Sequence, residues 1–206
     1  MQITEKIKIT NEDNMTLMSR YEDNYFDLAI CDPPYGINIA NKSFRSKHEK
    51  KSWDEEVPKK EYFEELFRVS KHQIIWGGNY FDLPPTQNYI IWDKIQPMNF
   101  SSAMAEIAWC SIQMPIKIYK RHVVTAEPNK IHPTQKPVDL YKFLINKYLI
   151  EKMGGGKILD THVGSGSIAI ACHDYGEKIK SCEIDKKYFE DTVKRIQNHV
   201  SQLKLF

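Results

Sequence analysis

The segment Lys157–Asp185, KILDTHVGSGSIAIACHDYGEKIKSCEID, constrains the fold more than any other part of the chain. A short apolar strand ends at Asp160, and a loop with Gly164 and Gly166 follows. A helix and a second strand then lead to Glu183. Glycines permit a tight turn that approaches a ligand closely, and an acid about 20 residues further on can bind two ribose hydroxyls. The segment therefore predicts one half of a parallel α/β sheet with a nucleoside-binding loop.

The glycine loop leaves two kinds of nucleoside cofactor open. Gly164–Ala169 also satisfies the G-x-G-x-x-G/A pattern of dinucleotide-binding folds, so an NAD-linked oxidoreductase is one alternative. Only 23 residues follow Glu183 in a chain of 206, whereas a dinucleotide fold needs several further strand–helix units there. The rest of the sheet must then come from the N-terminal side, which is a circularly permuted order with the cofactor half last.

The remaining apolar runs complete an α/β domain that spans residues 1–206. Several runs with strand character lack strict alternation, as expected for a parallel sheet covered by helices on both faces. The expected strands are Tyr25–Cys31, Gln73–Trp76, Tyr89–Trp92, Glu106–Ser111, Lys157–Asp160 and Lys180–Ile184. The expected helices are Lys59–Ser70, Pro137–Ile150, Ser167–Tyr175 and Lys186–Leu203.

Composition excludes several other classes of protein. Hydrophobic residues make up 41% and charged residues 27%, which is the balance of a globular domain. No apolar run approaches the roughly 20 residues of a membrane span, and the N-terminus MQITEKIKIT is too charged for a signal peptide. We therefore expect a cytoplasmic protein with no membrane contact. The four cysteines have no C-x-x-C spacing, which predicts reduced, buried thiols and no metal site: Cys31, Cys110, Cys172 and Cys182.

Charge is distributed unevenly along the chain despite a net charge of only +2. The stretch Lys42–Lys51 has a local net charge of +4 and reads as a loop, whereas Asp54–Glu65 has −4 and leads into an amphipathic helix. A basic run is either a solvated surface or a contact for phosphates. Its candidate DNA-binding residues are Lys42, Arg45, Lys47, Lys50 and Lys51.

A second motif, Asp32-Pro33-Pro34-Tyr35, follows the strand Tyr25–Cys31. The two prolines have no N–H, so the turn presents mainly acceptors: the Asp32 carboxylate and the carbonyl oxygens of Asp32 and Pro33. With the flat ring of Tyr35, these acceptors suit an amino-bearing base that stacks and donates along its edge. Ligands of open α/β sheets lie at the carboxyl ends of the strands, so this turn and the glycine loop should lie close together. The alternative is a rigid turn with a surface tyrosine.

These motifs occur in an order that identifies a family. Asp32–Tyr35, then His132–Pro137 (HPTQKP) before a helix, then the glycine loop, together resemble the N6-adenine/N4-cytosine DNA methyltransferases of the permuted β type. The resemblance covers nearly the whole chain, and Ile90–Lys94 (IIWDK) is also typical of such enzymes. It implies a Rossmann-like, mostly parallel seven-stranded sheet with one antiparallel strand. It further implies S-adenosylmethionine as cofactor, DNA as partner, a bacterial or phage-infected host cell and, as in many relatives, a homodimer.

The resemblance also assigns roles to residues. It places Asp160, Gly164 and Gly166 in the cofactor pocket and Glu183 on the ribose hydroxyls. Near the methionine end it places Thr134, Gln135 and Lys136, and Asp13 is the candidate beside the cofactor's adenine. Asp32 and the Pro33 carbonyl would accept the hydrogens of the target amine, and Tyr35 would stack on the flipped base.

The resemblance favours adenine N6 as the methylated atom, because N4-cytosine enzymes more often have serine where this chain has Asp32. N4-cytosine methylation, methylation of an RNA adenine and a non-catalytic nucleic-acid-binding protein remain alternatives. The chain departs from the family at Thr161-His162, where many relatives have Pro-Phe. His162 either touches the cofactor or caps the loop, and we expect the cap. Gly77–Tyr80 either lines the target side or forms a plain turn. Only residues 37–58 and 113–131, the latter including the hairpin-like Lys117–Lys130, remain for DNA recognition, which predicts a short or relaxed site.

Overall fold

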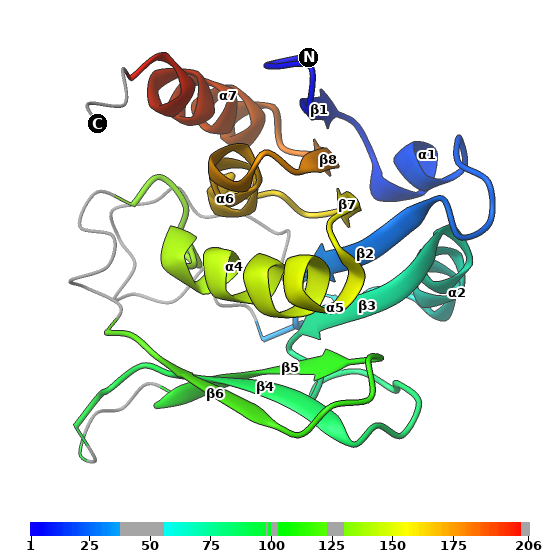
Figure 1. Ribbon diagram of the computed structural model, residues 1–206, viewed down its shortest axis with the longest axis vertical. Helices are drawn as coiled ribbons and strands as arrows, with labels where there is room; N and C mark the ends of the chain where they lie inside the picture. Colours follow the sequence, from blue (N-terminus) through cyan, green and yellow to red (C-terminus); the bar gives the residue numbers. More distant parts are fainter. Residues whose placement is uncertain (38–55, 98, 100–102, 123–129, 203–206) are drawn as a thin grey trace.

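The computed structural model describes residues 1–37, 56–97, 99, 103–122 and 130–202, which form one sheet with helices on both faces (Figure 1). Within these residues the sheet has eight strands in the order β1-β8-β7-β2-β3-β5-β4-β6. The strands are β1 (Ile7–Asn11), β2 (Phe26–Cys31), β3 (Ser70–Trp76), β4 (Asn88–Asp93), β5 (Ala105–Cys110), β6 (Lys117–Lys120), β7 (Lys157–Asp160) and β8 (Lys178–Glu183). The strand that leads to the glycine loop, β7, thus lies between β8 and β2, the strand that leads to the Asp-Pro-Pro-Tyr turn.

The strand directions match the prediction of one antiparallel strand, but the predicted number of seven strands was wrong. Only β5 runs against its described neighbours, since it pairs antiparallel with both β3 and β4. The eighth strand is β6, which pairs in parallel with β4, Ile90 opposite Lys117. The hairpin-like interpretation of Lys117–Lys130 remains a prediction, because residues 123–129 lie outside the described residues. A strand of four residues that alternates between half-buried and exposed gives too weak a pattern to identify.

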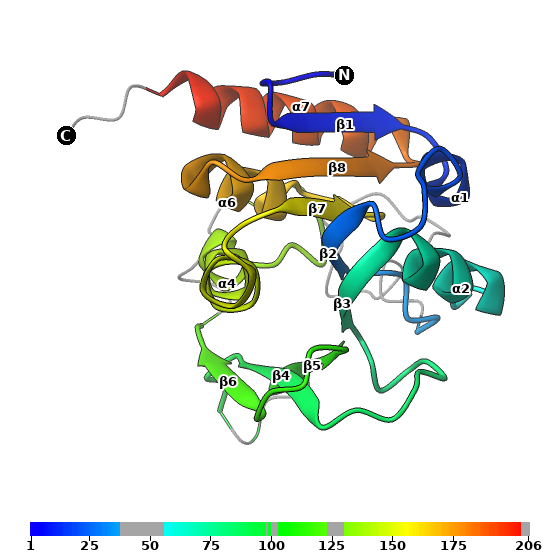
Figure 2. The same ribbon diagram turned by 45° about the vertical axis from the view of Figure 1, so that its right-hand side comes forward.

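Two helical layers cover the sheet (Figure 2). On one face pack α4 (Val138–Leu144), the π-helical turn η3 (Ile145–Ile150) that continues it, α5 (Glu151–Met153), α6 (Ser167–Tyr175) and α7 (Lys186–Ser201). On the other face pack α1 (Asn14–Met18) and α2 (Lys60–Val69). The four predicted helices are present, and the short helix α1 is an addition. No helix among the described residues is long and apolar enough to cross a bilayer.

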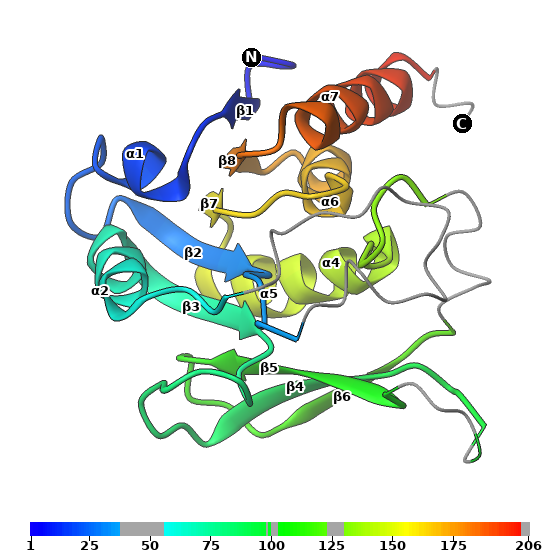
Figure 3. The same ribbon diagram turned by 180° about the vertical axis from the view of Figure 1, so that it is seen from behind.

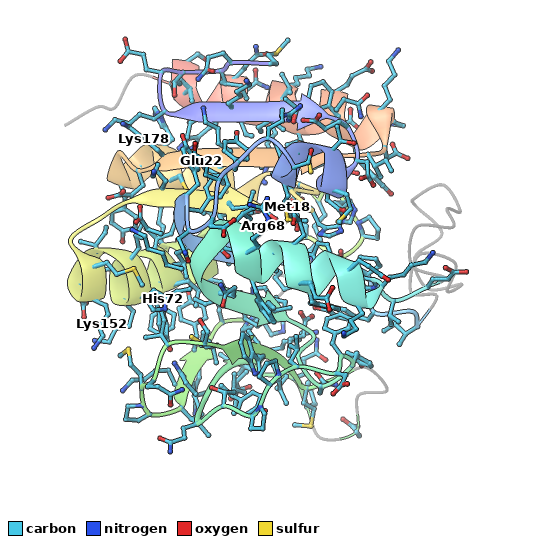
Figure 4. All side chains as sticks on the ribbon, turned by 90° about the vertical axis from the view of Figure 1, so that its right-hand side faces the viewer. Met18, Glu22, Arg68, His72, Lys152 and Lys178 are labelled. Carbon is cyan, nitrogen blue, oxygen red and sulfur yellow. The ribbon has the colours of Figure 1, made fainter. Side chains whose placement is uncertain are left out.

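Helix α2 is amphipathic, as its sequence pattern predicts. Tyr62, Leu66 and Val69 lie on one face and are buried against the sheet. Figure 4 labels Arg68 near the C-terminal end of this helix. Arg68 binds Glu65 and Asp23, both at 2.7 Å, and donates to the carbonyl of Tyr21. These contacts attach the end of the helix to the loop before β2, and so help to fix the strand that carries the Asp-Pro-Pro-Tyr turn.

One edge of the sheet collects acidic side chains. The parallel strands β1, β8, β7 and β2 end at this edge, and each ends in or is followed by an acid. These acids are Asp13, Glu183, Asp160 and Asp32. In Figure 3 the arrowheads of the neighbouring strands β2 and β3 end side by side. Because β5 runs the opposite way, its first residues lie at this same edge and bring Glu106 there.

Candidate functional site

A cavity of about 280 Å³ opens at this edge of the sheet. Its wall combines the turn after β2, the HPTQKP segment and the glycine loop, segments that lie far apart in the sequence. The Asp-Pro-Pro-Tyr turn and the glycine loop thus share one cavity, as the positions of the strand ends predict. The wall consists of Glu12, Asp13, Asn14, Asp32, Pro34, His132, Thr134, Gln135, Lys136, Tyr141, Thr161, His162, Val163, Gly164, Ser165, Glu183, Ile184 and Tyr188.

Glu183 is held in the wall by backbone groups. Its carboxylate accepts hydrogen bonds from the N–H of Gly164 at 3.1 Å and from the N–H of Asp185 at 3.0 Å. Burial raises the pKa of Glu183, and the backbone N–H groups act in the opposite direction. A carboxylate has about four lone-pair sites, so Glu183 can still accept hydrogen bonds from hydroxyl groups of a ligand.

Two of the predicted cofactor residues, Asp160 and Gly166, are not among the residues that line the cavity. Asp160 is 2% exposed, and its carboxylate accepts from the N–H of His162 at 3.0 Å. Burial raises the pKa of Asp160 to about 8. Gly166 begins α6 with a φ of 75°, and a Cβ atom there would lie 2.8 Å from side-chain atoms of both Ile196 and Thr192. These two residues therefore shape the glycine loop, and their predicted contact with a cofactor stays a prediction.

His162 does more than cap the loop, because it also lines the cavity. Its Nε2 atom lies 3.1 Å from Nδ2 of Asn14, and its Nδ1 atom lies 2.9 Å from the Thr161 hydroxyl. Burial lowers the pKa of His162 to about 4, so the ring is neutral at neutral pH. Asp13 lies in the same wall and caps α1, where it accepts from the N–H of Met15 at 2.8 Å. Its predicted position beside a ligand and its capping role are compatible, since a carboxylate has several acceptor sites.

Both oxygens of the Asp32 carboxylate have partners. The Tyr35 hydroxyl donates to Oδ1 at 2.6 Å, and the ammonium group of Lys136 binds Oδ2. Burial raises the pKa of Asp32, whereas Lys136 lowers it. The side chain of Lys136 is 2% exposed and reaches the turn after β2. Lys136 thus lines the cavity with Thr134 and Gln135, and its direct partner is Asp32.

Sequence reasoning did not identify Glu106, a second carboxylate that binds Lys136. Glu106 binds Lys136 through Oε2 at 3.2 Å and Lys94 through Oε1 at 2.7 Å. Burial would raise the pKa of Glu106, but Lys136 and Lys94 outweigh it and lower the pKa to about 2. Four charges of alternating sign therefore follow one another: Lys94, Glu106, Lys136 and Asp32. The available signal in the sequence was a single acid at the start of the apolar run EIAWCS.

Tyr35 is held by the turn that follows β3. Its ring stacks on Tyr80, with 5.0 Å between centroids and an angle of 12°, and meets Phe81 edge-on. Gly77 has a φ of 72°, and a Cβ atom there would lie 2.3 Å from Cε1 of Tyr35. Only glycine fits at this position without moving the ring. The turn Gly77–Tyr80 therefore supports Tyr35, which gives it a specific structural role in the site.

Some of the predicted DNA-contact residues lie outside the described residues. The five basic candidates fall within residues 38–55, which the structure does not describe: Lys42, Arg45, Lys47, Lys50 and Lys51. Of the 113–131 segment, residues 123–129 are likewise not described. All four cysteines are buried and free of disulfides. No group of three or more side chains that could hold a metal ion occurs in the described part of the chain.

Comparisons with known proteins agree on one class. A family model described as DNA methylase matches residues 75–194. Type II methyltransferase M.HpaI of Haemophilus parainfluenzae is 25% identical over 229 residues, which cover 88% of this chain and 71% of that protein. Among solved structures, the M1.HpyAVI-SAM complex is similar with a TM-score of 0.61, 19% identity, and coverage of 91% of this chain and 98% of that chain. The PvuII DNA methyltransferase, described as cytosine-N4-specific, has a TM-score of 0.60, 11% identity, and coverage of 96% and 93%. At these identities the solved structures show a shared fold.

Proposed function

Since the chain belongs to the DNA methylase family, we propose that it methylates the N6 amine of a flipped adenine in DNA, with S-adenosylmethionine as the methyl donor. Methyl transfer to an exocyclic amine in DNA is the activity of the family as a whole. The choice of adenine is the finer part of the proposal. The proposal as a whole rests above all on one observation. Asp32 lies in the cavity wall, and the Tyr35 hydroxyl donates a hydrogen bond to its carboxylate.

The cavity fits S-adenosylmethionine by the chemistry of its wall. The cofactor has a positive sulfonium group and two ribose hydroxyls, and the wall offers carboxylates to both. Glu183 would bind the hydroxyls, and Asp13 would lie beside the adenine. Thr134 and Gln135 would hold the amino-acid end. Because the His162 ring is neutral, it adds no positive charge that would oppose a cation.

Asp32 makes the target amine a better nucleophile. When bound, the cofactor supplies a methyl group that its positive sulfur already activates. The lone pair of an exocyclic amine is delocalised into its ring, and acceptors for both amine hydrogens favour a pyramidal nitrogen with a localised lone pair. The Asp32 carboxylate and the Pro33 carbonyl would be these acceptors, so the protein contributes position and fixed dipoles. No covalent enzyme intermediate is required.

Tyr35 would stack on the flipped base. A base inside a duplex cannot reach the site, so it must leave the stack at a cost of a few kcal/mol, which stacking in the enzyme partly offsets. The hydroxyl bond to Asp32 fixes the ring, and Tyr80 covers one of its faces. The basic run Lys42–Lys51 and the segment 113–131 remain our proposed contacts to DNA.

N4-cytosine methylation is the second candidate, because one solved structure with the same fold is cytosine-N4-specific. Cytosine and adenine present the same amino hydrogens, and the acid at position 32 favours adenine. Sequencing that detects modified bases, on DNA from cells with and without the protein, distinguishes the two. We expect N6-methyladenine in a short motif that disappears with Asp32→Ala. N4-methylcytosine, or modified adenine confined to the RNA of the same cells, would contradict the proposal.

A further inference from the structure

The charged group Lys94, Glu106, Lys136 and Asp32 joins four segments of the chain at the sheet edge, and Lys94 directly follows β4. Lys136 lies two residues before the start of α4. Asp32 directly follows β2, and Glu106 is the second residue of β5. The ammonium group of Lys136 lies between two carboxylates, with Asp32 on one side and Glu106 at 3.2 Å on the other. It also lies 3.5 Å from the Tyr35 hydroxyl and 5.2 Å from the ring centre of Trp76.

Burial makes this arrangement sensitive to the loss of any member. With a side chain 2% exposed, Lys136 cannot readily replace a lost partner with bulk water. An ammonium group has three N–H donors, and here they are divided among Asp32, Glu106 and Tyr35. Without Glu106, Asp32 would be the one described carboxylate in contact with Lys136. The positive charge of Lys136 would then act on Asp32 without a competing carboxylate from Glu106.

Glu106 is itself held on rigid elements. It lies opposite Trp92 in the antiparallel pair β4–β5. Lys94, two residues beyond Trp92, binds Glu106 at 2.7 Å and lies 5.4 Å from the centre of the Trp92 ring. Strand pairing and this second lysine fix the Glu106 carboxylate on the far side of Lys136 from Asp32.

From this geometry we propose that Glu106 is a positioning residue for methyl transfer: by sharing Lys136, it keeps the Asp32 carboxylate a strong acceptor toward the target amine. The inference rests on the proposed function and adds a residue that acts through Lys136. In the step itself, the carbon–nitrogen bond forms while the carbon–sulfur bond breaks and its electron pair stays on sulfur. The surplus proton of the methylated amine passes to Asp32 and then to solvent.

The groups that face Asp32 act on it in opposite directions. Burial and the negative charge of Glu106 raise its pKa, whereas Lys136 and the Tyr35 hydrogen bond lower it. Tyr141 and Asp160 are also near enough to interact with its charge. Removing the charge of Glu106 therefore lowers the pKa of Asp32 and makes it a weaker proton acceptor.

The substitution Glu106→Gln tests the proposal in the full-length protein with S-adenosylmethionine and DNA. We expect kcat to fall about 10- to 100-fold, which corresponds to weakening one hydrogen bond to a charged group. The acid limb of the kcat profile should move to lower pH, and the KM for the cofactor should change less than about threefold. Glu106→Asp should recover part of kcat. Lys94→Met, which frees Glu106 from its anchor, should change kcat in the same direction by a smaller factor.

The control is Glu151→Gln, which removes the same charge from a lysine pair on η3 and α5, with Lys147 at 2.6 Å. It should leave kcat and the pH profile unchanged. A Glu106→Gln protein with wild-type kcat and an unmoved acid limb would overturn the inference. So would a parallel loss of kcat and cofactor binding with a lower Tm, since that is a purely structural effect. A wild-type protein that methylates no DNA would instead overturn the proposed function.

Discussion

The two halves of the sheet edge hold their carboxylates by different means. In the half formed by β1, β8 and β7, the carboxylates of Asp13, Glu183 and Asp160 accept hydrogen bonds from backbone N–H groups. In the half formed by β2, β5 and β4, Asp32 and Glu106 bind the ammonium groups of Lys136 and Lys94. Backbone N–H groups hold Asp13 and Glu183 in the cavity wall as acceptors, which suits a ligand with hydroxyl groups. Burial instead raises the pKa of Asp160 to about 8, so this side chain is largely protonated at neutral pH. Lysine pairs cancel the charge and leave an acceptor whose strength depends on its neighbours.

The largest expected effect comes from removing the acceptor of the lysine-paired half. Asp32→Asn keeps the shape of the side chain but cannot accept at both oxygens or take a proton. We expect kcat to fall by about 10³-fold, while the cofactor Kd changes less than about threefold. Single-turnover kinetics and titration calorimetry on the same preparation measure the two quantities. Activity within tenfold of wild type would show that this half does not contain the catalytic acceptor.

Glu183→Gln should produce the opposite pattern, since it changes the backbone-held half. Losing one hydrogen bond to a charged group should raise the cofactor Kd about 10- to 100-fold. At saturating cofactor, kcat should stay within about threefold of wild type, because Asp32 and its lysine are untouched. Calorimetry with S-adenosylmethionine tests the first statement and steady-state kinetics the second. A loss of kcat without a loss of affinity would contradict the division between the two halves.

Gly77→Ala tests whether the close packing of Gly77 against Tyr35 contributes to catalysis in the Asp32 half of the sheet edge. The new Cβ atom would lie 2.3 Å from Cε1 of Tyr35, at a φ of 72°. We expect a loss of about 2–3 kcal/mol in the free energy of unfolding and about a tenfold fall in kcat as the ring moves. Gly154→Ala is the matched control, because its φ is 79° but nothing lies within 4 Å of the added atom. It should cost about 1 kcal/mol and leave kcat unchanged. Urea unfolding and kinetics compare them, and equal effects on kcat would exclude a role for the contact with Tyr35.

The last expected effect is a difference in how stability depends on pH. The pKa of Asp160 is raised to about 8 in the folded state, so the fold binds its proton more tightly than the unfolded chain does. This contribution to stability is complete below the ordinary pKa of 3.8 and is lost as the pH rises toward 8. Asp160→Asn should therefore gain in Tm relative to wild type as the pH rises from 5 to 9.

Glu106→Gln is the comparison for this pH series. The pKa of Glu106 is lowered to about 2, so its contribution is present above its ordinary pKa and is lost only as the pH falls toward 2. The Tm difference between wild type and Glu106→Gln should be constant between pH 5 and 9. Thermal unfolding at several pH values measures both variants. Parallel curves for the two variants would show that the two halves do not differ in their protonation.

The sequence predicts the acids that follow parallel strands better than the acid on the antiparallel strand β5. Acids at the ends of parallel strands must meet at one edge, so Asp32 and Glu183 were found from the strand pattern and the family motifs. Glu106 comes from the beginning of β5, and only the pairing of β5 with β3 shows that this strand runs the opposite way. A strand pattern alone does not give that direction.

Side-chain direction and short edge strands account for the other features that the sequence did not predict. Asp160 and Gly166 occupy the predicted loop, but the sequence does not show whether a loop residue points into the cavity or away from it. In the structure Asp160 accepts from the His162 N–H, and Gly166 packs against α7. The edge strand β6 has four residues and no buried face, so neither periodicity nor hydrophobicity reveals it.

The central claim is methyl transfer to adenine by the Asp32 half with cofactor held by the Glu183 half. It is tested most directly by incubating the purified protein with labelled S-adenosylmethionine and duplex DNA, digesting the DNA to nucleosides and identifying the product by mass spectrometry. We predict labelled N6-methyldeoxyadenosine with the wild-type protein and none with Asp32→Asn, although both bind the cofactor. Labelled N4-methyldeoxycytidine as the product, or N6-methyldeoxyadenosine at the wild-type rate from Asp32→Asn, would contradict the claim.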